Sequence, residues 1–265
     1  MPRDITAFSN ATVKLLRSLR DKKGRRAERM FLAEGLRILA DARACGRLPR
    51  IIAFADEGAR HPLAQAIIAE TEVAGGDAVR TTEDILTKMS GKDNAPLLLG
   101  AFAQDDLSLD RIDRTTADIW IVAQALRDPG NVGTILRTGD AVGAGGLILI
   151  DDCADPYSVE AVRASMGAIF TQQVAQARWE DFLPWLRGGP GRLVGTSLQT
   201  EQDYLTARYD KPCFLLIGNE QQGLPEAYEA QCDLLVKIPM AGKADSLNAA
   251  IAAAVMAFQL RASWR

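Results

Sequence analysis

The sequence contains one histidine, four cysteines and no long apolar run, and each scarcity excludes a class of function. The histidine, His61, precedes a proline in a polar turn, which predicts a helix-start role and leaves no histidine as a general base. The cysteines show no CxxC or metal-ligand spacing, so we expect reduced, buried thiols and no metal site. No apolar signal segment follows Met1, and the apolar stretch near the C-terminus is too short to cross a bilayer. We therefore expect a cytoplasmic protein without a membrane partner.

Two glycine-rich stretches lack the surroundings that nucleotide binding requires. Residues 143–146 (GAGG) lie between a predicted helix and a predicted strand, whereas a dinucleotide-binding loop follows a strand and opens a helix. Residues 218–223 (GNEQQG) have a P-loop-like glycine spacing, but no Lys-Ser/Thr pair follows to hold a phosphate and magnesium. These misplaced glycines disfavour a nicotinamide-dependent oxidoreductase, which stays the alternative that a binding titration with NAD would test.

The charge of the chain is unevenly distributed. With 265 residues, 48% of them hydrophobic, the chain can bury two modest cores, and its net charge is −3. Residues 1–50, however, hold 13 of the 31 lysines and arginines and only 5 of the 34 aspartates and glutamates. A basic end of this kind suits a polyanionic partner, and the plain alternative is a solvated basic helix face.

Residues 1–104 are predicted to form a small α/β domain. Six cations crowd residues 20–29, which is too dense for burial and predicts an exposed basic arm. Periodicity and end signals predict helices over residues 10–19, 36–44, 62–70 and 82–90, and strands over 31–33, 51–55 and 96–103. The polar stretch 105–118 is the predicted linker.

Residues 119–265 are predicted to form a second α/β domain around a mostly parallel sheet covered by helices. Helical segments separate six predicted strands, over residues 119–125, 147–150, 173–177, 193–196, 214–217 and 234–238. Asp245-Ser246 offers an N-cap for a helix over residues 247–260, whose apolar residues lie nearly all the way round, so we expect it to be buried on several sides.

Polar residues gather where the last two strands end. Ligands of open α/β sheets bind beyond the carboxyl ends of the strands, so the two loops could form one pocket. Asn219 and Glu220 follow one strand, and Ser246 precedes the last helix. Asn248 is expected inside that otherwise apolar helix, where a turn-forming role does not explain it. We infer that this region holds a polar ligand.

Three ordered motifs carry a resemblance to a known family. Residues 128–138 (DPGNVGTILRT), 218–224 (GNEQQGL) and the pair VKIPM and SLNAA, within residues 236–250, resemble the signatures of the SpoU (TrmH-type) RNA ribose 2′-O-methyltransferases. The resemblance implies a C-terminal trefoil knot, S-adenosylmethionine as cofactor and a homodimer. The first domain resembles the ribosomal-protein-like substrate-binding domain of the rRNA-modifying branch. This second resemblance implies an RNA partner, with rRNA favoured over tRNA.

The same resemblance assigns the catalytic and cofactor-binding candidates, and the charge distribution supplies the RNA-binding ones. The catalytic candidates are Arg137, Asn131, Glu220, Ser246 and Asn248. The cofactor-binding candidates are Thr196, Gly218, Asn219, Ile238, Met240 and Leu247. The RNA-binding candidates, whose positive charges suit phosphate contact, are Lys22, Lys23, Arg25, Arg26 and Arg163.

Simpler alternatives accompany several of these assignments. Arg137 could form an ion pair with Asp140, Ser246 could be only an N-cap, Glu220 only a helix-start carboxylate, and Arg163 an ordinary surface arginine. A guanidinium stays protonated in proteins, so we expect Arg137 to hold the target phosphate and stabilise the incipient alkoxide rather than act as a base. An inactive RNA-binding relative is the remaining alternative, and the joint presence of the catalytic candidates argues against it.

Overall fold

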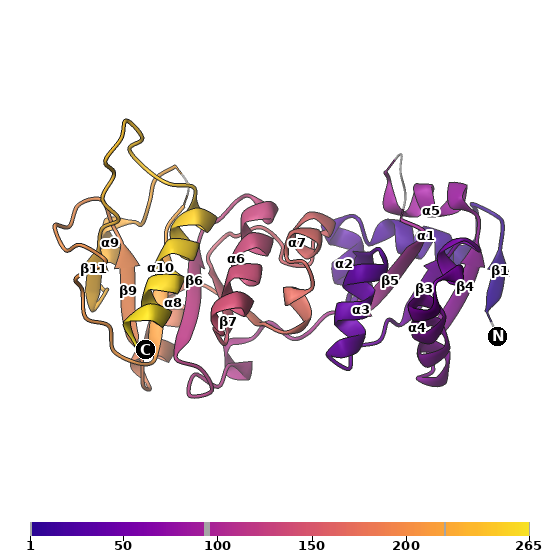
Figure 1. Ribbon diagram of the computed structural model, residues 1–265, viewed down its shortest axis with the longest axis horizontal. Coiled ribbons are helices and arrows are strands. Elements are labelled where there is room, and N and C mark those ends of the chain that lie inside the picture. Colours follow the sequence, from indigo (N-terminus) through magenta and orange to yellow (C-terminus); the bar gives the residue numbers. More distant parts are fainter. Residues whose placement is uncertain (1, 93–95, 220, 265) are drawn as a thin grey trace. The chain divides into compact units, whose positions relative to one another are not determined.

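The computed structural model describes residues 2–92, 96–219 and 221–264. By their contacts these residues form two compact units (Figure 1). The first unit consists of Met1–Asp105 with Tyr157–Phe170, and the second of Asp106–Pro156 with Thr171–Arg265. The predicted domain limits of 1–104 and 119–265 stay predictions. Within the second unit, Leu109 and Ile112 of the predicted linker pack in the hydrophobic core.

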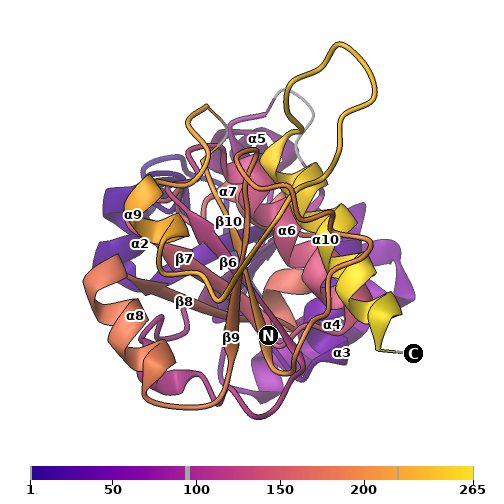
Figure 2. The ribbon, with the colours of Figure 1, turned by 90° about the vertical axis from the view of Figure 1, so that its left-hand side faces the viewer.

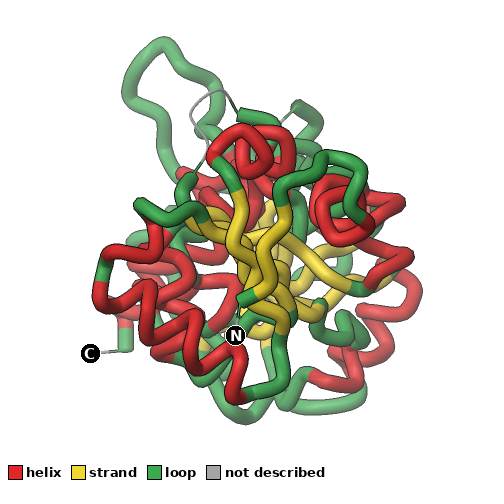
Figure 3. Tube along the Cα trace, turned by 90° about the vertical axis from the view of Figure 1, so that its right-hand side faces the viewer, coloured by secondary structure: helices red, strands yellow, loops and turns green. Residues whose placement is uncertain are grey.

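The first unit is built on a mixed five-stranded sheet with helices on both sides (Figure 3). Strand β5 runs antiparallel to both of its neighbours, β3 and β2, and the other pairs are parallel. In spatial order the strands are β1 (Arg3–Ile5), β4 (Asp77–Thr81), β3 (Ile51–Phe54), β5 (Leu98–Ala103) and β2 (Met30–Glu34). The helices are α1 (Ala11–Ser18), α2 (Lys22–Glu28), α3 (Leu36–Ala44), α4 (Pro62–Val73), α5 (Glu83–Ser90) and α7 (Val159–Ala164).

Local signals explain where two of these helices begin. The side chain of Asn10 accepts a hydrogen bond of 2.8 Å from the backbone N–H of Thr12, and α1 follows at once. His61 accepts a bond of 3.2 Å from the N–H of Leu63 at the start of α4. The predicted helix-start role of His61 is therefore confirmed.

The predicted basic arm is a helix, and one of its cations is buried. Arg25 of α2 is 3% exposed, contrary to the expectation that the whole cluster faces solvent. Its Nη1 donates to the carbonyl oxygens of Leu19 (2.9 Å) and Arg20 (2.7 Å), which follow the C-terminus of α1. These carbonyls lack helix partners, and an arginine can satisfy them. Lys22, Lys23 and Arg26 are exposed as predicted.

A segment from the second half of the chain completes the first unit. Tyr157 packs on Phe31 with ring centroids 4.7 Å apart, and Phe170 packs on Phe102 at 4.8 Å. All four rings are buried, and the hydroxyl of Tyr157 accepts a bond of 3.1 Å from the N–H of Asp105. Four rings packed in this way anchor residues 157–170 to the first unit.

The second unit is built on a six-stranded sheet that is parallel throughout. All six predicted strands are present, so the predicted sheet is confirmed. In spatial order they are β11 (Leu234–Val236), β9 (Arg192–Thr196), β10 (Cys213–Ile217), β6 (Ile119–Gln124), β7 (Gly146–Ile150) and β8 (Gln173–Ala177). Strand β11 ends at Val236, two residues earlier than predicted.

Helices cover both faces of this sheet (Figure 2). Helices α6 (Pro129–Val142) and α10 (Ala249–Ser263) pack on each other and on one face. Helix α8 (Trp179–Arg187) covers the other face, where Phe182 and Leu186 join the core of Trp120 and Phe214. The short helix α9 (Glu226–Glu229) lies on the side of α8 in the same view. Helix α10 is less buried than predicted, because Ile251 and Phe258 are 53% and 55% exposed.

Two further expectations concern cysteines and membranes. All four cysteines are free thiols, and Cys153 and Cys213 are buried, but Cys45 is exposed, contrary to the prediction. Among the helices of the described residues, none combines the length and apolar character that a membrane span requires.

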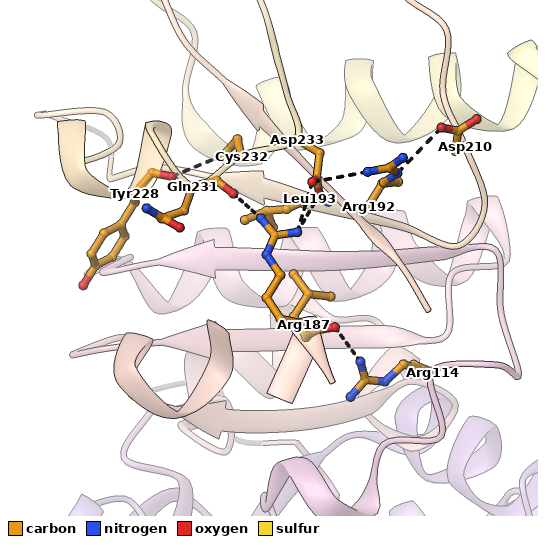
Figure 4. Close-up of polar contacts among 10 residues, drawn as sticks. Arg114, Arg187, Arg192, Leu193, Asp210, Tyr228, Gln231, Cys232 and Asp233 are labelled. Carbon is orange, nitrogen blue, oxygen red and sulfur yellow. Dashed lines mark hydrogen bonds and ion pairs between the residues drawn. The ribbon is translucent and has the colours of Figure 1, made fainter. Parts of the chain in front are cut away.

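Asp233, directly before β11, connects three elements of the second unit (Figure 4). Its carboxylate accepts bonds from the N–H of Leu193 in β9 (2.7 Å) and from Nη1 of Arg187 at the end of α8 (2.9 and 3.0 Å). Burial raises the pKa of the Asp233 carboxyl, but these bonds and the charges of Arg187 and Arg192 outweigh burial and hold the pKa below its ordinary value. Asp233 therefore stabilises the edge of the sheet as a carboxylate.

We predict a pH-dependent loss of stability in Asp233→Asn. A carboxyl whose pKa is lower in the folded state stabilises the fold above its unfolded pKa, and this contribution disappears as pH falls through the folded value. At pH 7 the variant should lose about 2 kcal/mol of unfolding free energy, and the difference from wild type should shrink below about pH 4. Urea unfolding at a series of pH values measures this. Asp210→Asn, which removes an exposed partner of Arg192, is the control, and a pH-independent difference for Asp233→Asn would contradict the assignment.

Candidate active site

One cavity of about 590 Å³ lies at the carboxyl ends of β9, β10 and β11 and the start of α10. This is the position at which ligands bind to open parallel sheets. The six predicted cofactor-binding residues and Ser246 all line it: Thr196, Gly218, Asn219, Ile238, Met240, Ser246 and Leu247. The structure thus brings together residues that are up to 51 positions apart in the sequence, as the predicted pocket requires.

Gly218 allows two segments of backbone to approach each other beside the cavity. A Cβ atom at this position would lie 2.3 Å from the carbonyl carbon of Gly223 and 2.5 Å from the nitrogen of Leu224. Because both contacts are backbone, no rotamer change could relieve them. Residue 218 therefore has to be glycine for the loop after β10 to close against itself.

Asn219 shapes the same loop with its side chain. Its Nδ2 donates to the carbonyl oxygen of Ala125 at 2.8 Å, and its Oδ1 accepts from the N–H groups of Gln221 and Gln222. Its backbone pairs with Gly223 in both directions. Asn219 thus joins the ends of β6 and β10, and its side-chain amide supports the cavity wall.

Asn248 is the N-cap of α10, which corrects two predictions. The helix starts at Ala249 rather than residue 247, and Asn248 lies outside it rather than within it. Its Oδ1 accepts from the N–H groups of Ala250 (2.9 Å) and Ile251 (3.3 Å), and its Nδ2 donates to Oδ1 of Asn131 at 3.1 Å. Two catalytic candidates thus contact each other, and they connect the starts of α6 and α10.

Ser246 does not cap the helix, contrary to the prediction. It is exposed in the loop before α10, and its Oγ donates to Oδ1 of Asp245 at 3.3 Å. It lines the cavity together with Asp245 and Leu247. Its hydroxyl can therefore reach a ligand by exchanging this long bond to Asp245.

Arg137 lies on α6, the helix that carries Asn131, and its side chain faces solvent. Asp140, its expected alternative partner, instead accepts a bond of 2.7 Å from Thr171. Among the described residues, nothing forms a hydrogen bond or ion pair with the Arg137 guanidinium. Arg137 and Asn131 do not line the cavity, and Glu220 lies outside the described residues.

Two carboxylates in the cavity wall were not among the predicted site residues. Glu226 and Glu229 come from α9, in the segment after the Gly218 loop, which was assigned only as an unspecified helix. The signal that could have identified them is their place in the segment that connects the two predicted strands whose ends form the pocket. Together with Asp245 they place three carboxylates in the cavity wall, which suits a cationic ligand.

Two groups near this end of the sheet, Tyr228 and Cys153, have raised pKa values and stay neutral at pH 7. Burial, a bond to Asp151 and nearby carboxylates raise the pKa of Tyr228 to about 12, and its hydroxyl donates to Asp151 Oδ2 at 3.0 Å. Burial raises the pKa of the Cys153 thiol to about 11. Neither group can supply an anionic nucleophile at neutral pH. The geometry therefore points to positioning and electrostatics rather than covalent catalysis.

Comparison with known proteins identifies the family. Residues 118–258 match the SpoU rRNA Methylase family, and residues 10–100 match the MRM3-like substrate binding domain. This chain belongs to the SpoU rRNA methylase family. The family predicted from the motifs is therefore confirmed.

Similar proteins cover both parts of this SpoU-family chain. A 23S rRNA (uridine-2′-O)-methyltransferase of Streptomyces viridochromogenes is 35% identical over 69% of this chain and 66% of its own length. The 23S rRNA (guanosine-2′-O)-methyltransferase RlmP of Bacillus subtilis is 27% identical over 98% of this chain and 99% of its own. An AdoMet-bound rRNA methyltransferase from Sinorhizobium meliloti superposes with a TM-score of 0.91 at 38% identity, covering 98% of this chain and 97% of that one.

We predict that two substitutions of Asn248 differ in stability. Asn248→Ala removes the cap and should cost about 1 kcal/mol of unfolding free energy. Asn248→Asp keeps an acceptor for the N–H groups of Ala250 and Ile251 and adds a charge that a helix N-terminus favours, so its melting temperature should stay close to that of wild type. Thermal unfolding distinguishes the two. An equal loss in both variants would mean that the bond to Asn131, rather than the cap, carries the stability.

Proposed function

We propose that this chain transfers a methyl group from S-adenosylmethionine to a ribose 2′-hydroxyl of rRNA. One observation carries the proposal: the cavity at the strand ends is lined by all six residues that the family resemblance assigns to the cofactor. The AdoMet-bound relative from Sinorhizobium meliloti, with its TM-score of 0.91, supports the same assignment. Both curated rRNA relatives described above are 2′-O-methyltransferases.

The residues around the cavity fit S-adenosylmethionine. A volume of about 590 Å³ lies within the range of ligand pockets, roughly 300–1,000 Å³. An adenosine can be held by the backbone at Gly218 and Ile238 and by the apolar side chains of Met240 and Leu247. The carboxylates of Glu226 and Glu229 line the same cavity and favour a positively charged group there. When bound, the sulfonium supplies the methyl carbon that the ribose oxygen attacks.

On the acceptor side, we assign the principal role to Arg137. Its exposed guanidinium has no partner among the described residues, so it can bind an incoming phosphate and stabilise negative charge on the ribose oxygen. Asn131 and Asn248 act as positioning residues, since their mutual bond fixes the start of the helix that carries Arg137. Ser246, in the cavity wall, can orient the hydroxyl that reacts. The proposed role of Glu220 rests on the family motif alone.

RNA binding is assigned to the first unit, which contains the match to the MRM3-like substrate binding domain. Lys22, Lys23 and Arg26 of α2 are exposed and suited to phosphate contact. The side chain of Arg25, a further RNA-binding candidate, donates hydrogen bonds to carbonyl groups at the end of α1 and so stabilises the fold. We propose rRNA rather than tRNA because the two curated relatives described above act on 23S rRNA.

We also propose a homodimer formed through α10 and a trefoil knot in the second unit. The exposed Ile251 and Phe258 form an apolar stripe of a kind that pairing buries. A shallow hollow beside Phe258, lined by Val142 and Val255, extends this surface.

For the knot, the supporting observation is the path of the chain. After β10 the chain passes β9 to form β11, and it then returns through α10, which packs on β10 and β6.

One prediction from the proposed function concerns cofactor binding. Gly218→Ala should weaken S-adenosylmethionine binding at least tenfold, because its Cβ would force apart the backbone around Gly223 that lines the cavity. Gly242→Ala is the matched control, since a Cβ at Gly242 meets nothing within 4 Å, and it should bind normally. Calorimetry measures both affinities. Unchanged binding by Gly218→Ala would count against the assigned pocket.

Another prediction from the proposed function concerns the transfer step. Arg137→Ala should reduce methyl transfer to rRNA at least a hundredfold, while S-adenosylmethionine affinity stays within a few-fold, because Arg137 does not line the cavity. Arg137→Lys should also fail, since a point charge does not reproduce the planar guanidinium fork. The measurement is incorporation of labelled methyl into an unmethylated 23S rRNA transcript. Wild-type turnover in either variant would refute the proposed role, and absence of transfer by the wild-type chain to rRNA would refute the proposed substrate.

A further inference from the structure

Met166 occupies a strained and exposed position in the first unit. It follows Ser165, the C-cap of α7, and adopts the left-handed backbone conformation with a φ of 48°. Glycine is the usual residue at this point of a helix end, because a side chain there costs about 1–2 kcal/mol. Met166 is 40% exposed, so burial offsets only part of this cost. A strained residue that the fold does not require points to a role in binding.

The surrounding turn holds Met166 in this conformation. The N–H of Met166 donates to the carbonyl of Arg163 at 3.2 Å, and the buried hydroxyl of Ser165 donates to the carbonyl of Val162 at 2.7 Å. Gly167 also has a positive φ, 93°, and a Cβ there would lie 2.7 Å from Oδ2 of Asp41 on α3. The side chain at the tip is therefore presented to solvent by a fixed backbone.

Cations flank the same part of the first unit. Helix α7 packs on β2, the edge strand of the five-stranded sheet. Helix α2, with its exposed lysines and Arg26, also contacts β2 and directly precedes it. Arg163, near the end of α7, is exposed and lies three residues before Met166. Helices α2 and α7, each with exposed cations, thus lie against the same strand.

We propose that the α7 turn is an RNA-contacting element, in which Arg163 binds a backbone phosphate and Met166 packs against the face of an unpaired base. RNA recognition commonly uses unstacked bases packed on side chains, and a thioether makes favourable contacts with aromatic rings. This inference rests on the proposed function and extends it. In the sequence the turn lies within residues 118–258, which match the methylase family, but in the structure it belongs to the first unit, to which substrate binding is assigned.

The decisive variant is Met166→Gly in the full-length chain. Glycine adopts a positive φ without strain, so the melting temperature should rise or stay level, while affinity for RNA should fall several-fold. The probe is an in vitro transcript of bacterial 23S rRNA, with binding measured over a series of salt concentrations. Val73→Ala, which trims a 90% exposed apolar side chain elsewhere in this unit, is the control and should change neither quantity.

Arg163→Gln tests the phosphate contact. It should reduce the slope of log affinity against log salt by about one, whereas Met166→Gly should lower affinity without changing the slope. The triple variant Lys22→Ala, Lys23→Ala and Arg26→Ala provides the reference for loss of phosphate contacts. Calorimetry should give wild-type affinity for S-adenosylmethionine in all of these variants.

The possible outcomes separate this inference from the proposed function. Wild-type RNA affinity in Met166→Gly, or a lower melting temperature, would overturn the role of Met166, and an unchanged slope in Arg163→Gln would overturn the phosphate contact. If the wild-type chain binds the transcript without methylating it, the proposed function fails and the binding comparisons still decide the inference. If the wild-type chain does not bind RNA, both fail.

Discussion

The N–H groups at the start of α10 need hydrogen-bond partners, and the side chain of Asn248 supplies them. The other half of the same amide reaches Asn131, near the start of α6. One side chain therefore sets where the last helix begins and how it meets the helix that carries Arg137. The flanking residues Leu247 and Ala249 line the cavity, so the position of the cavity wall depends on this capping bond.

The polar side chains of the family motifs divide into two groups by what they contact. Asn219 forms hydrogen bonds with backbone groups, and Asn248 bonds backbone at the start of α10 and the side chain of Asn131, which fixes the segments at the strand ends. Arg137 differs, since none of the described residues contacts its charge. In the function that we propose, main chain holds the methyl donor and the Arg137 cation receives the polyanion. Preorganised groups reduce the reorganisation that the reaction requires.

How much could be predicted from the sequence depended on burial. All six strands of the second unit were predicted, and the signal was strongest for β6, β7 and β10, which are buried throughout and appear as continuous apolar runs. In the first unit, β1 has three residues, and in β4 two buried residues separate the exposed Asp77 and Arg80, which breaks the alternation typical of a strand, so neither gave a clear signal. The burial of Arg25 depends on carbonyls that α1 leaves unpaired, and the cap at Asn248 depends on where the preceding loop ends. Both features depend on contacts that form only in the folded chain, so the spacing of residue types does not predict them.

The placement of residues 157–170 in the first unit has a consequence for the order in which the chain folds during synthesis. Phe31 and Phe102 emerge from the ribosome early, but the rings that cover them, Tyr157 and Phe170, follow 55 and 68 residues after Phe102. At about 5–20 residues per second, those aromatic faces stay without their partners for several seconds. The N-terminal unit therefore cannot finish folding first, as a simple string of domains would. It is completed only after the first two strands of the methylase sheet have been made.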